Sequence, residues 1–329
     1  MKRKWWLVFA ASAVLALTAA ACGGDDDDDG GSSGNSGNLS GSIRVDGSST
    51  VGPLTEGIAE EFNRENPDVN VTVGTSGTGG GFEKFCAGET DISDASRPIE
   101  PDEEKACQAK GIGYDAIQVA NDALTVVANP NNPVNCLTTD QLKQVWEPKS
   151  SVDNWSQIQG LQPSFDSELA LYSPGTDSGT FDFFTEKVNG EEGAQRTAGV
   201  NDIGEDDNAT VTGVAGAEGG TGYFGYSFFK ENEDKLKALQ IDSGNGCVGP
   251  SAQSAQDGSY FLSRPLYVYP SDKALQNETV DEFLRFYLDS INAIAEQIGF
   301  IPMTDQQLQE SQSKLESLTS GGGGGTTTG

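Results

Sequence analysis

The sequence Thr75-Ser76-Gly77-Thr78-Gly79-Gly80-Gly81-Phe82 follows directly after the alternating pattern Val69-Asn70-Val71-Thr72-Val73. This alternation predicts a β-strand, and the aromatic residues after the glycines predict a helix. A second run of this kind, Thr176-Asp177-Ser178-Gly179-Thr180-Phe181, follows the apolar residues 169–172. A helix N-terminus has unpaired N–H groups and a partial positive charge, and glycine lets a ligand approach the backbone closely. Both runs therefore predict a binding site for a small oxyanion.

Strand and helix patterns alternate over residues 43–318. Besides residues 69–73 and 169–172, strands are expected at residues 43–45, 117–120, 124–128, 211–215, 221–226 and 265–269. Helices are expected at residues 53–66, 101–110, 138–146, 178–188, 281–298 and 305–318, and one runs through Phe82, Phe85 and Cys86. This alternation is typical of an α/β fold with a parallel sheet.

The N-terminal residues have the composition of an export signal. Residues 1–21 form a basic start and an apolar stretch that is too short for a membrane span, and they are expected to be a signal peptide. Ala19-Ala20-Ala21-Cys22 resembles a bacterial lipobox, in which Cys22 becomes the lipid-bearing first residue; the alternative is an ordinary cleaved signal. Residues 22–42 are expected to be a disordered linker and residues 321–329 a disordered tail. The protein is therefore expected on the outer face of the cytoplasmic membrane, anchored by lipid.

Charge and composition exclude several classes of function. The formal net charge is −30, which disfavours nucleic acid as a partner. The chain has no histidine, so the commonest general base and the commonest zinc ligand are both missing. Four cysteines besides Cys22 show no C-x-x-C spacing, and an even number in an exported protein predicts disulfides, for which four cysteines allow three connectivities.

Further motifs accompany the two glycine runs in a fixed order. They are Asp46-Gly47-Ser48-Ser49-Thr50-Val51, Asp91-Ile92-Ser93-Asp94-Ala95-Ser96-Arg97-Pro98, Ser263-Arg264-Pro265-Leu266-Tyr267 and Gly299-Phe300-Ile301-Pro302. With these motifs the chain resembles the Pst-type phosphate-binding proteins, the extracytoplasmic receptors of ABC phosphate importers, over residues 43–318. The resemblance implies a periplasmic-binding-protein-like fold of type II, in which two α/β lobes joined by two crossing strands close around the ligand.

The resemblance also implies where the lobes divide. The crossings would lie near Asp122–Leu124 and Arg264–Leu266. Lobe one would be residues 43–122 plus 265–320, and lobe two residues 123–264. We expect the disulfides Cys86–Cys107 and Cys136–Cys247, because each pair then lies within one lobe.

The resemblance further implies which residues bind the phosphate. They are Ser49, Thr50, Val51, Thr78, Gly79, Ser96 and Arg97 of lobe one, and Asp177, Ser178, Gly179 and Thr180 of lobe two. The best-known members of the family have an aspartate where this chain has Ser96, and an arginine where it has Pro174. We therefore expect Arg97 to supply the guanidinium, and Asp177 or Asp94 to accept the phosphate proton. The alternatives are a structural ion pair for Arg97 and a helix cap for Asp177, while Arg264 is expected to fix the hinge region.

The sequence thus predicts a monomeric, lipid-anchored receptor that captures inorganic phosphate without catalysis, cofactor or metal and presents it to the membrane permease of an ABC transporter. Another oxyanion such as sulfate is the alternative ligand. A secreted phosphate-ester hydrolase is disfavoured, because no G-x-S-x-G motif surrounds Ser178 and no histidine exists to activate it. An adhesin or sensor ectodomain with the same fold is compatible with the sequence.

Overall fold

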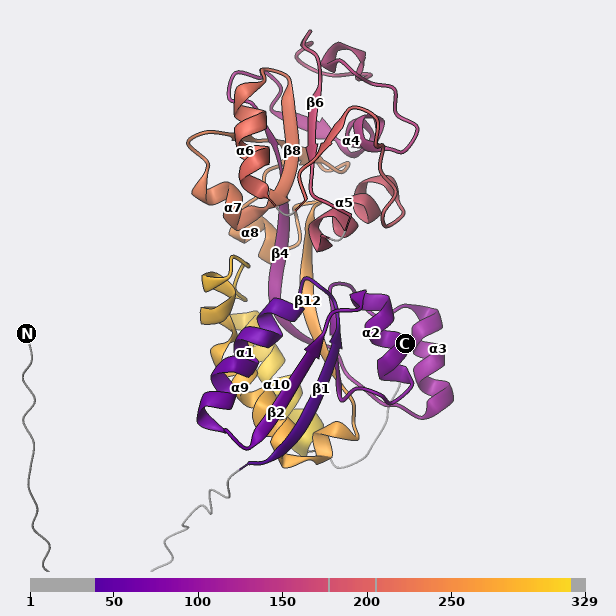
Figure 1. Ribbon diagram of the computed structural model, residues 1–329, viewed down its shortest axis with the longest axis vertical. Helices are drawn as coiled ribbons and strands as arrows, with labels where there is room; N and C mark the ends of the chain where they lie inside the picture. Colours follow the sequence, from indigo (N-terminus) through magenta and orange to yellow (C-terminus); the bar gives the residue numbers. More distant parts are fainter. Residues whose placement is uncertain (1–38, 177, 205, 321–329) are drawn as a thin grey trace, which may run out of the picture. The chain divides into compact units, whose positions relative to one another are not determined.

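The computed structural model describes residues 39–176, 178–204 and 206–320 (Figure 1). The predicted signal peptide, Cys22, most of the predicted linker, Asp177 and the predicted tail lie outside the described residues. The predicted linker end at residue 42 is wrong, because Leu39 already packs against the first hydrophobic core and a strand begins at Gly41. None of the described helices has the length and apolar character needed to cross a membrane.

The described strands form one large mixed sheet and one small sheet. The large sheet has the order β2-β1-β3-β12-β4-β8-β6-β7, with β9 also beside β4, and the small one has the order β11-β10-β5. The strands of the large sheet are β1 Gly41–Gly47, β2 Val69–Gly74, β3 Ile92–Ala95, β4 Ile117–Ala128, β6 Ala170–Ser173, β7 Val200–Asp202, β8 Gly220–Gly225, β9 Lys237–Ala238 and β12 Ser263–Pro270. The small sheet contains β5 Cys136–Thr138, β10 Gln240–Asp242 and β11 Cys247–Val248.

Helices cover both faces of the large sheet. They are α1 Gly52–Glu65, α2 Gly77–Cys86, α3 Pro101–Lys110, α4 Thr139–Trp146, α5 Gly179–Asn189, α6 Asp207–Gly216, α7 Tyr226–Glu231, α8 Ala252–Gln256, α9 Glu278–Gln297 and α10 Asp305–Ser320. Around β1, β2 and β3, the helices α1 and α9 bury one apolar cluster, and α2 with α3 bury another. Around β6 and β8, the helices α4 and α5 contribute to one cluster and α6 to another.

Two strands, β4 and β12, connect these two groups of elements, which we call the first and the second lobe (Figure 1). The first part of β4 pairs antiparallel with β12, and its second part, from Leu124 to Ala128, pairs antiparallel with β8. The strand pattern within each lobe is mostly parallel: β1 lies between β2 and β3, and β6 lies between β7 and β8. The carboxyl ends of these parallel strands lead into the turns that were predicted to bind an anion.

Two strand predictions were wrong. Residues 211–215 belong to helix α6, because the carboxylate of Asp206 caps the N–H of Asn208 and starts a helix there. Val211 and Val214 then lie one turn apart on the buried face. Residues 117–120 and 124–128 form one continuous strand, since Asn121 and Asp122 both pair with β12.

The predicted start of helix α2 was also wrong. The helix begins at Gly77, so the glycine run forms its first turns instead of a loop before it. This helix approaches β1 closely: a Cβ on Gly81 would lie 2.4 Å from the Cα of Gly47 and 3.0 Å from the carbonyl oxygen of Asp46. Only glycine at position 81 permits this packing.

Both predicted disulfides are confirmed. Cys86–Cys107 joins α2 to α3 within the first lobe, and Cys136–Cys247 joins β5 to β11 within the second. Neither disulfide therefore connects the two lobes.

We expect replacement of both Cys136 and Cys247 by serine to lower the free energy of unfolding by about 4 kcal/mol. The bond spans a sequence separation of 111 residues, so its removal releases a large loop in the unfolded chain. Little packing is lost, because Cys136 is half-buried and Cys247 is exposed. The measurement is urea unfolding of the double variant and of the parent. A parent in which only Cys136–Cys247 has been reduced, with the buried Cys86–Cys107 bond intact, should have the same unfolding midpoint as the double variant. An unchanged unfolding midpoint would show that this bond does not stabilise the fold.

Candidate functional site

The first predicted anion-binding turn connects β1 to α1. The N–H of Ser48 donates to the carbonyl oxygen of Asp94 at 2.9 Å, which fixes the turn to β3. The hydroxyl of Ser48 accepts the N–H groups of Thr50 at 3.2 Å and Val51 at 3.4 Å. The N–H groups of Thr50 and Val51, which were predicted to bind the anion, are thus held by the hydroxyl of Ser48. The predicted ligand residues did not include Ser48. The hydroxyls of Ser49 and Thr50 lie beside Gly179 of the second lobe instead.

The second lobe approaches that turn through the N-terminus of α5. Ser178 caps this helix, because its hydroxyl accepts the N–H of Thr180 at 3.3 Å. The next residue, Gly179, is so close to the first lobe that a Cβ on it would lie 2.7 Å from Oγ1 of Thr50 and 2.9 Å from Oγ of Ser49. The structure therefore brings together predicted ligand residues from both lobes.

The remaining hydroxyl residues of the first lobe form a pair of their own. Thr78 lies in the first turn of α2, and Ser96 lies directly after β3. Their hydroxyl oxygens are 3.0 Å apart, and the N–H of Ser96 donates to Oγ1 of Thr78 at 3.2 Å. Both residues are partly exposed, so their hydroxyls can exchange this mutual contact for a ligand.

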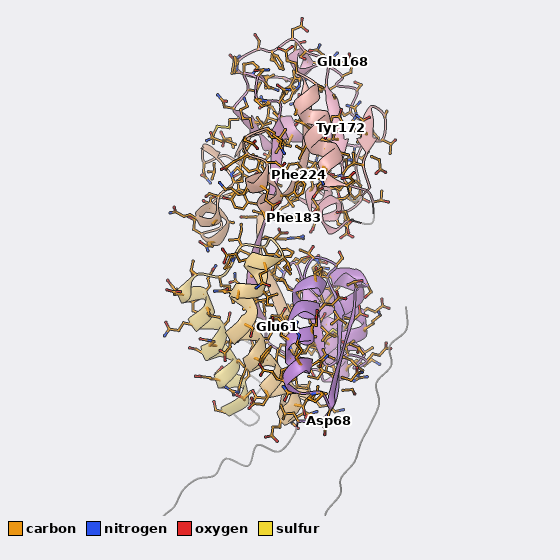
Figure 2. All side chains as sticks on the ribbon, turned by 60° about the vertical axis from the view of Figure 1, so that its left-hand side comes forward. Glu61, Asp68, Glu168, Tyr172, Phe183 and Phe224 are labelled. Carbon is orange, nitrogen blue, oxygen red and sulfur yellow. A yellow bond between two sulfur atoms is a disulfide. The ribbon has the colours of Figure 1, made fainter. Side chains whose placement is uncertain are left out.

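The guanidinium of Arg264 lies between these turns. Its Nη2 donates to Oγ1 of Thr50 at 2.9 Å and is 3.5 Å from the carbonyl oxygen of Gly179, while its Nε donates to Oδ2 of Asp122 at 3.1 Å. The guanidinium carbon lies 3.9 Å from the ring centroid of Phe183. Figure 2 shows Phe183 at the end of the second lobe near the crossing strands, with Glu168 at the opposite end. Arg264 therefore contacts residues of both lobes from a crossing strand.

Arg97 has different partners from those expected. Its Nη1 and Nη2 donate to the two carboxylate oxygens of Glu103, each at 2.9 Å, and its Nε lies 3.4 Å from a carboxylate oxygen of Glu100. The hydrogen bond with Glu103 is the largest cause of the raised pKa of Arg97. The guanidinium still lies near the ligand turn, since a Cβ on Gly79 would be 3.7 Å from its Nη2. In this arrangement Arg97 attaches the start of α3 to the Thr78 turn, and its ligand role stays a prediction.

Asp94, one predicted proton acceptor, is fully buried. Burial is the main cause that raises its pKa to about 8; the nearby Thr55 hydroxyl lowers the pKa, and the charges of Asp46 and Glu56 raise it further. Among the described residues, neither carboxylate oxygen has a hydrogen-bond partner at normal geometry, because the Thr55 hydroxyl is bonded to that of Tyr287. Burial thus favours the neutral acid form of Asp94 at neutral pH, and a neutral acid is a poor acceptor for the phosphate proton. The other predicted acceptor, Asp177, lies outside the described residues.

Sequence reasoning assigned Arg264 to the hinge and overlooked its contacts with the ligand turns. Arg264 and Asp122 are both at most 8% exposed, although ionised side chains are seldom buried unless they are paired. A signal was present, because Arg264 interrupts an apolar strand and Asp122 interrupts another at the two predicted crossings. The sequence alone did not show that these strands pair with Arg264 opposite Asp122.

The fold and these motifs match known proteins. A family model described as "PBP superfamily domain" matches residues 32–290. The "Protein SphX" of Synechococcus elongatus is 43% identical over 283 residues, which cover 85% of this chain and 82% of that protein. The "Phosphate-binding protein PstS" of Staphylococcus saprophyticus is 42% identical over 289 residues, 86% of this chain and 87% of that protein.

A solved structure agrees with these relatives. The crystal structure titled as that of a possible phosphate binding protein from Planctomyces limnophilus has a TM-score of 0.78 and 41% identity, and the match covers 85% of this chain and 99% of that one. The chain belongs to the PBP superfamily and, within it, to the family of Pst-type phosphate-binding proteins. The predicted family and the predicted periplasmic-binding-protein-like α/β fold are thereby confirmed.

Proposed function

We propose that this protein binds inorganic phosphate outside the cytoplasm and delivers it to an ABC importer. The observation that carries this proposal is the meeting of two hydroxyl-rich helix starts, one from each lobe, at Thr50 and Gly179 beside the buried guanidinium of Arg264. Hydroxyls, backbone N–H groups and one guanidinium are suitable donors for a tetrahedral oxyanion. The names of the Staphylococcus saprophyticus relative and of the Planctomyces limnophilus structure, which describe phosphate-binding proteins, support the same ligand.

Binding is noncovalent in this proposal and closes the cleft. One lobe comprises residues 39–122 with 265–320 and the other residues 123–264, and donors from both converge on one anion. A ligand that contacts both lobes stabilises the closed arrangement over the open one, because only the closed arrangement satisfies both sets of contacts. The proposed ligand residues are Ser49, Thr50, Val51, Thr78, Gly79 and Ser96, with Asp177, Ser178, Gly179 and Thr180.

The proposed setting is the outer face of the cytoplasmic membrane. Its support is the sequence before residue 39: an apolar export signal, the lipobox-like Ala19-Ala20-Ala21-Cys22 and a polar linker. A lipid on Cys22 would keep a monomeric receptor close to its permease. The proposed role is binding and delivery, with no catalytic step.

We expect the mature protein to bind phosphate and to reject sulfate by about a hundredfold or more. Phosphate keeps a proton at neutral pH and can donate a hydrogen bond to the carboxylate of Asp177, the acceptor proposed here, whereas sulfate cannot donate and is repelled. Isothermal titration calorimetry with phosphate, arsenate and sulfate measures this difference, and arsenate should resemble phosphate in affinity. Equal affinities for phosphate and sulfate would contradict the phosphate assignment and favour a general oxyanion receptor.

A further inference from the structure

We propose that Arg264, and not Arg97, supplies the positive charge to the bound anion, and that Asp122 positions its guanidinium. This inference rests on the proposed function, because it assigns residues to the same oxyanion site. It changes the location of the charge: Arg264 lies on the crossing strand β12, whereas Arg97 follows β3 in the first lobe.

The hydrogen bonds of Arg264 leave donors for a ligand. Its Nε is used by Asp122, and its Nη2 lies against Thr50 and Gly179. Within the described part of the chain, its Nη1 has no hydrogen-bond partner. An anion that contacts the hydroxyl of Thr50 and the start of α5 would therefore find guanidinium N–H groups next to it. The planar fork of arginine matches two oxygens of such an anion.

The surroundings of Arg264 hold the guanidinium in one place. The side chain is 9% exposed, so the charge is removed from water and acts at short range. The ring of Phe183 stacks against one face at 3.9 Å, and the carboxylate of Asp122 fixes the Nε edge. Asp122 is the only ion-pair partner of Arg264 among the described residues, and the charges of Glu186 and Asp182 also act on this guanidinium.

Arg97 is less suited to this role. It faces the carboxylates of both Glu103 and Glu100, so the cluster of three has a net negative charge. Its Nη1 also donates to the carbonyl oxygen of Pro98 at 3.1 Å. An anion that bound Arg97 would have to displace Glu103 from a bidentate contact or tolerate two nearby carboxylates. The arrangement instead fits the structural ion pair named as the alternative above.

The position of Arg264 also links charge to closure. From the crossing strand, one guanidinium contacts Thr50 of the first lobe and Gly179 of the second. An anion bound there completes a set of contacts that exists only when the two turns are close together. Arg264 is thus expected to determine affinity through the closed arrangement of the lobes.

The test compares matched substitutions at the two arginines by phosphate calorimetry on the mature protein. We expect Arg264→Lys to weaken phosphate binding at least about thirtyfold, because a point charge cannot reproduce the fork, and Arg264→Gln to weaken it further. Arg97→Lys and Arg97→Gln should change affinity less than about threefold, while lowering thermal stability through the lost Glu103 contact. The opposite ranking of the two arginines would overturn the proposal.

Asp122 is tested by a double-mutant cycle. We expect Asp122→Asn to weaken phosphate binding, and the double variant Asp122→Asn with Arg264→Gln to bind no more weakly than Arg264→Gln alone, since Asp122 acts through Arg264. Additive losses would assign Asp122 an independent role. Circular dichroism and thermal unfolding show whether each variant is folded. If Arg264→Gln does not fold, Phe183→Leu serves instead, with an expected loss of about three- to tenfold from the missing cation–π contact.

The parent titration separates this proposal from the proposed function. A parent that binds sulfate and not phosphate contradicts the phosphate assignment. The arginine variants are then titrated with sulfate instead, because the proposed role of Arg264 is to supply charge to a tetrahedral oxyanion. A parent that binds neither anion refutes both. A parent that binds phosphate, with Arg264→Gln within about threefold of it, refutes the role of Arg264 alone.

Discussion

Replacement of Gly179 by alanine is expected to weaken phosphate binding by about ten- to a hundredfold. The new Cβ would lie 2.7 Å from Oγ1 of Thr50 and 2.9 Å from Oγ of Ser49, both shorter than normal contacts. Thr50 cannot move away without cost, because its hydroxyl accepts a hydrogen bond from Arg264. Such overpacking costs about 1–3 kcal/mol, and about 1.4 kcal/mol corresponds to tenfold in affinity. The cost applies to the closed arrangement, so it appears as lost affinity.

Calorimetry of Gly179→Ala measures this loss, with Gly216→Ala as the matched control. Gly216 lies in α6, and a Cβ there would meet no heavy atom of the described residues within 4 Å beyond its own helix backbone. The control should therefore bind phosphate as the parent does, and its helix should be slightly more stable. If both variants keep parental affinity, the lobes do not need the close approach at Gly179 in order to hold the ligand.

The elements that the sequence predicted well are those with local signals at their ends. Helix α1 was expected at residues 53–66 and spans Gly52–Glu65, with Pro53 in its first turn and Asn66 as its C-cap. Helix α3 was expected and found at residues 101–110, where Pro101 starts the helix and Gly111 ends it in a left-handed conformation. In both cases neighbouring residues alone determine the boundary.

The predictions that failed have two different causes. The glycine run at residues 77–81 has the composition of a loop, and nothing within the run indicates that it packs closely against Gly47 as part of a helix. The valines at 211 and 214 fit a short strand as well as a helix, and the local signal that decides between them, the cap at Asp206, was overlooked. Short apolar runs therefore remained ambiguous.

The site shows the same division between local and distant signals. The hydroxyl-rich turns were found because each motif is continuous in the sequence. Arg264 was placed at the hinge and not at the ligand, because its partner Asp122 is 142 positions away and Thr50 is 214 positions away. Arg97 was the preferred ligand arginine only because it adjoins a predicted anion-binding turn in the sequence. Its pairing with Glu103 depends on the orientation of α3, which the sequence does not show.

Replacement of Asp94 by asparagine is expected to remove a large pH dependence of stability. The carboxyl group of Asp94 has its pKa raised to about 8 in the folded protein, chiefly by burial, against about 4 in the unfolded chain. Below pH 4 both states hold the proton, and the full stability is present. Above pH 4 only the unfolded state loses the proton, so stability falls by about 1.4 kcal/mol per pH unit until about pH 8. Asparagine has the shape of the neutral acid and does not ionise.

Urea unfolding of the parent and of Asp94→Asn between pH 5 and pH 8 tests this expectation, with the variant gaining stability relative to the parent as the pH rises. Asp46→Asn is the control, and its stability difference from the parent should stay constant between pH 5 and pH 8, because Asp46 is ionised in both the folded and the unfolded state there. Burial raises the pKa of Asp46, but hydrogen bonds from Lys84 and Ser76 outweigh it and lower the pKa overall, so Asp46 contributes stability that is lost in acid. Asp46→Asn should therefore be less stable than the parent at neutral pH. A constant difference between parent and Asp94→Asn across this range would mean that Asp94 is ionised in the folded protein, which requires a donor or cation within reach of its carboxylate.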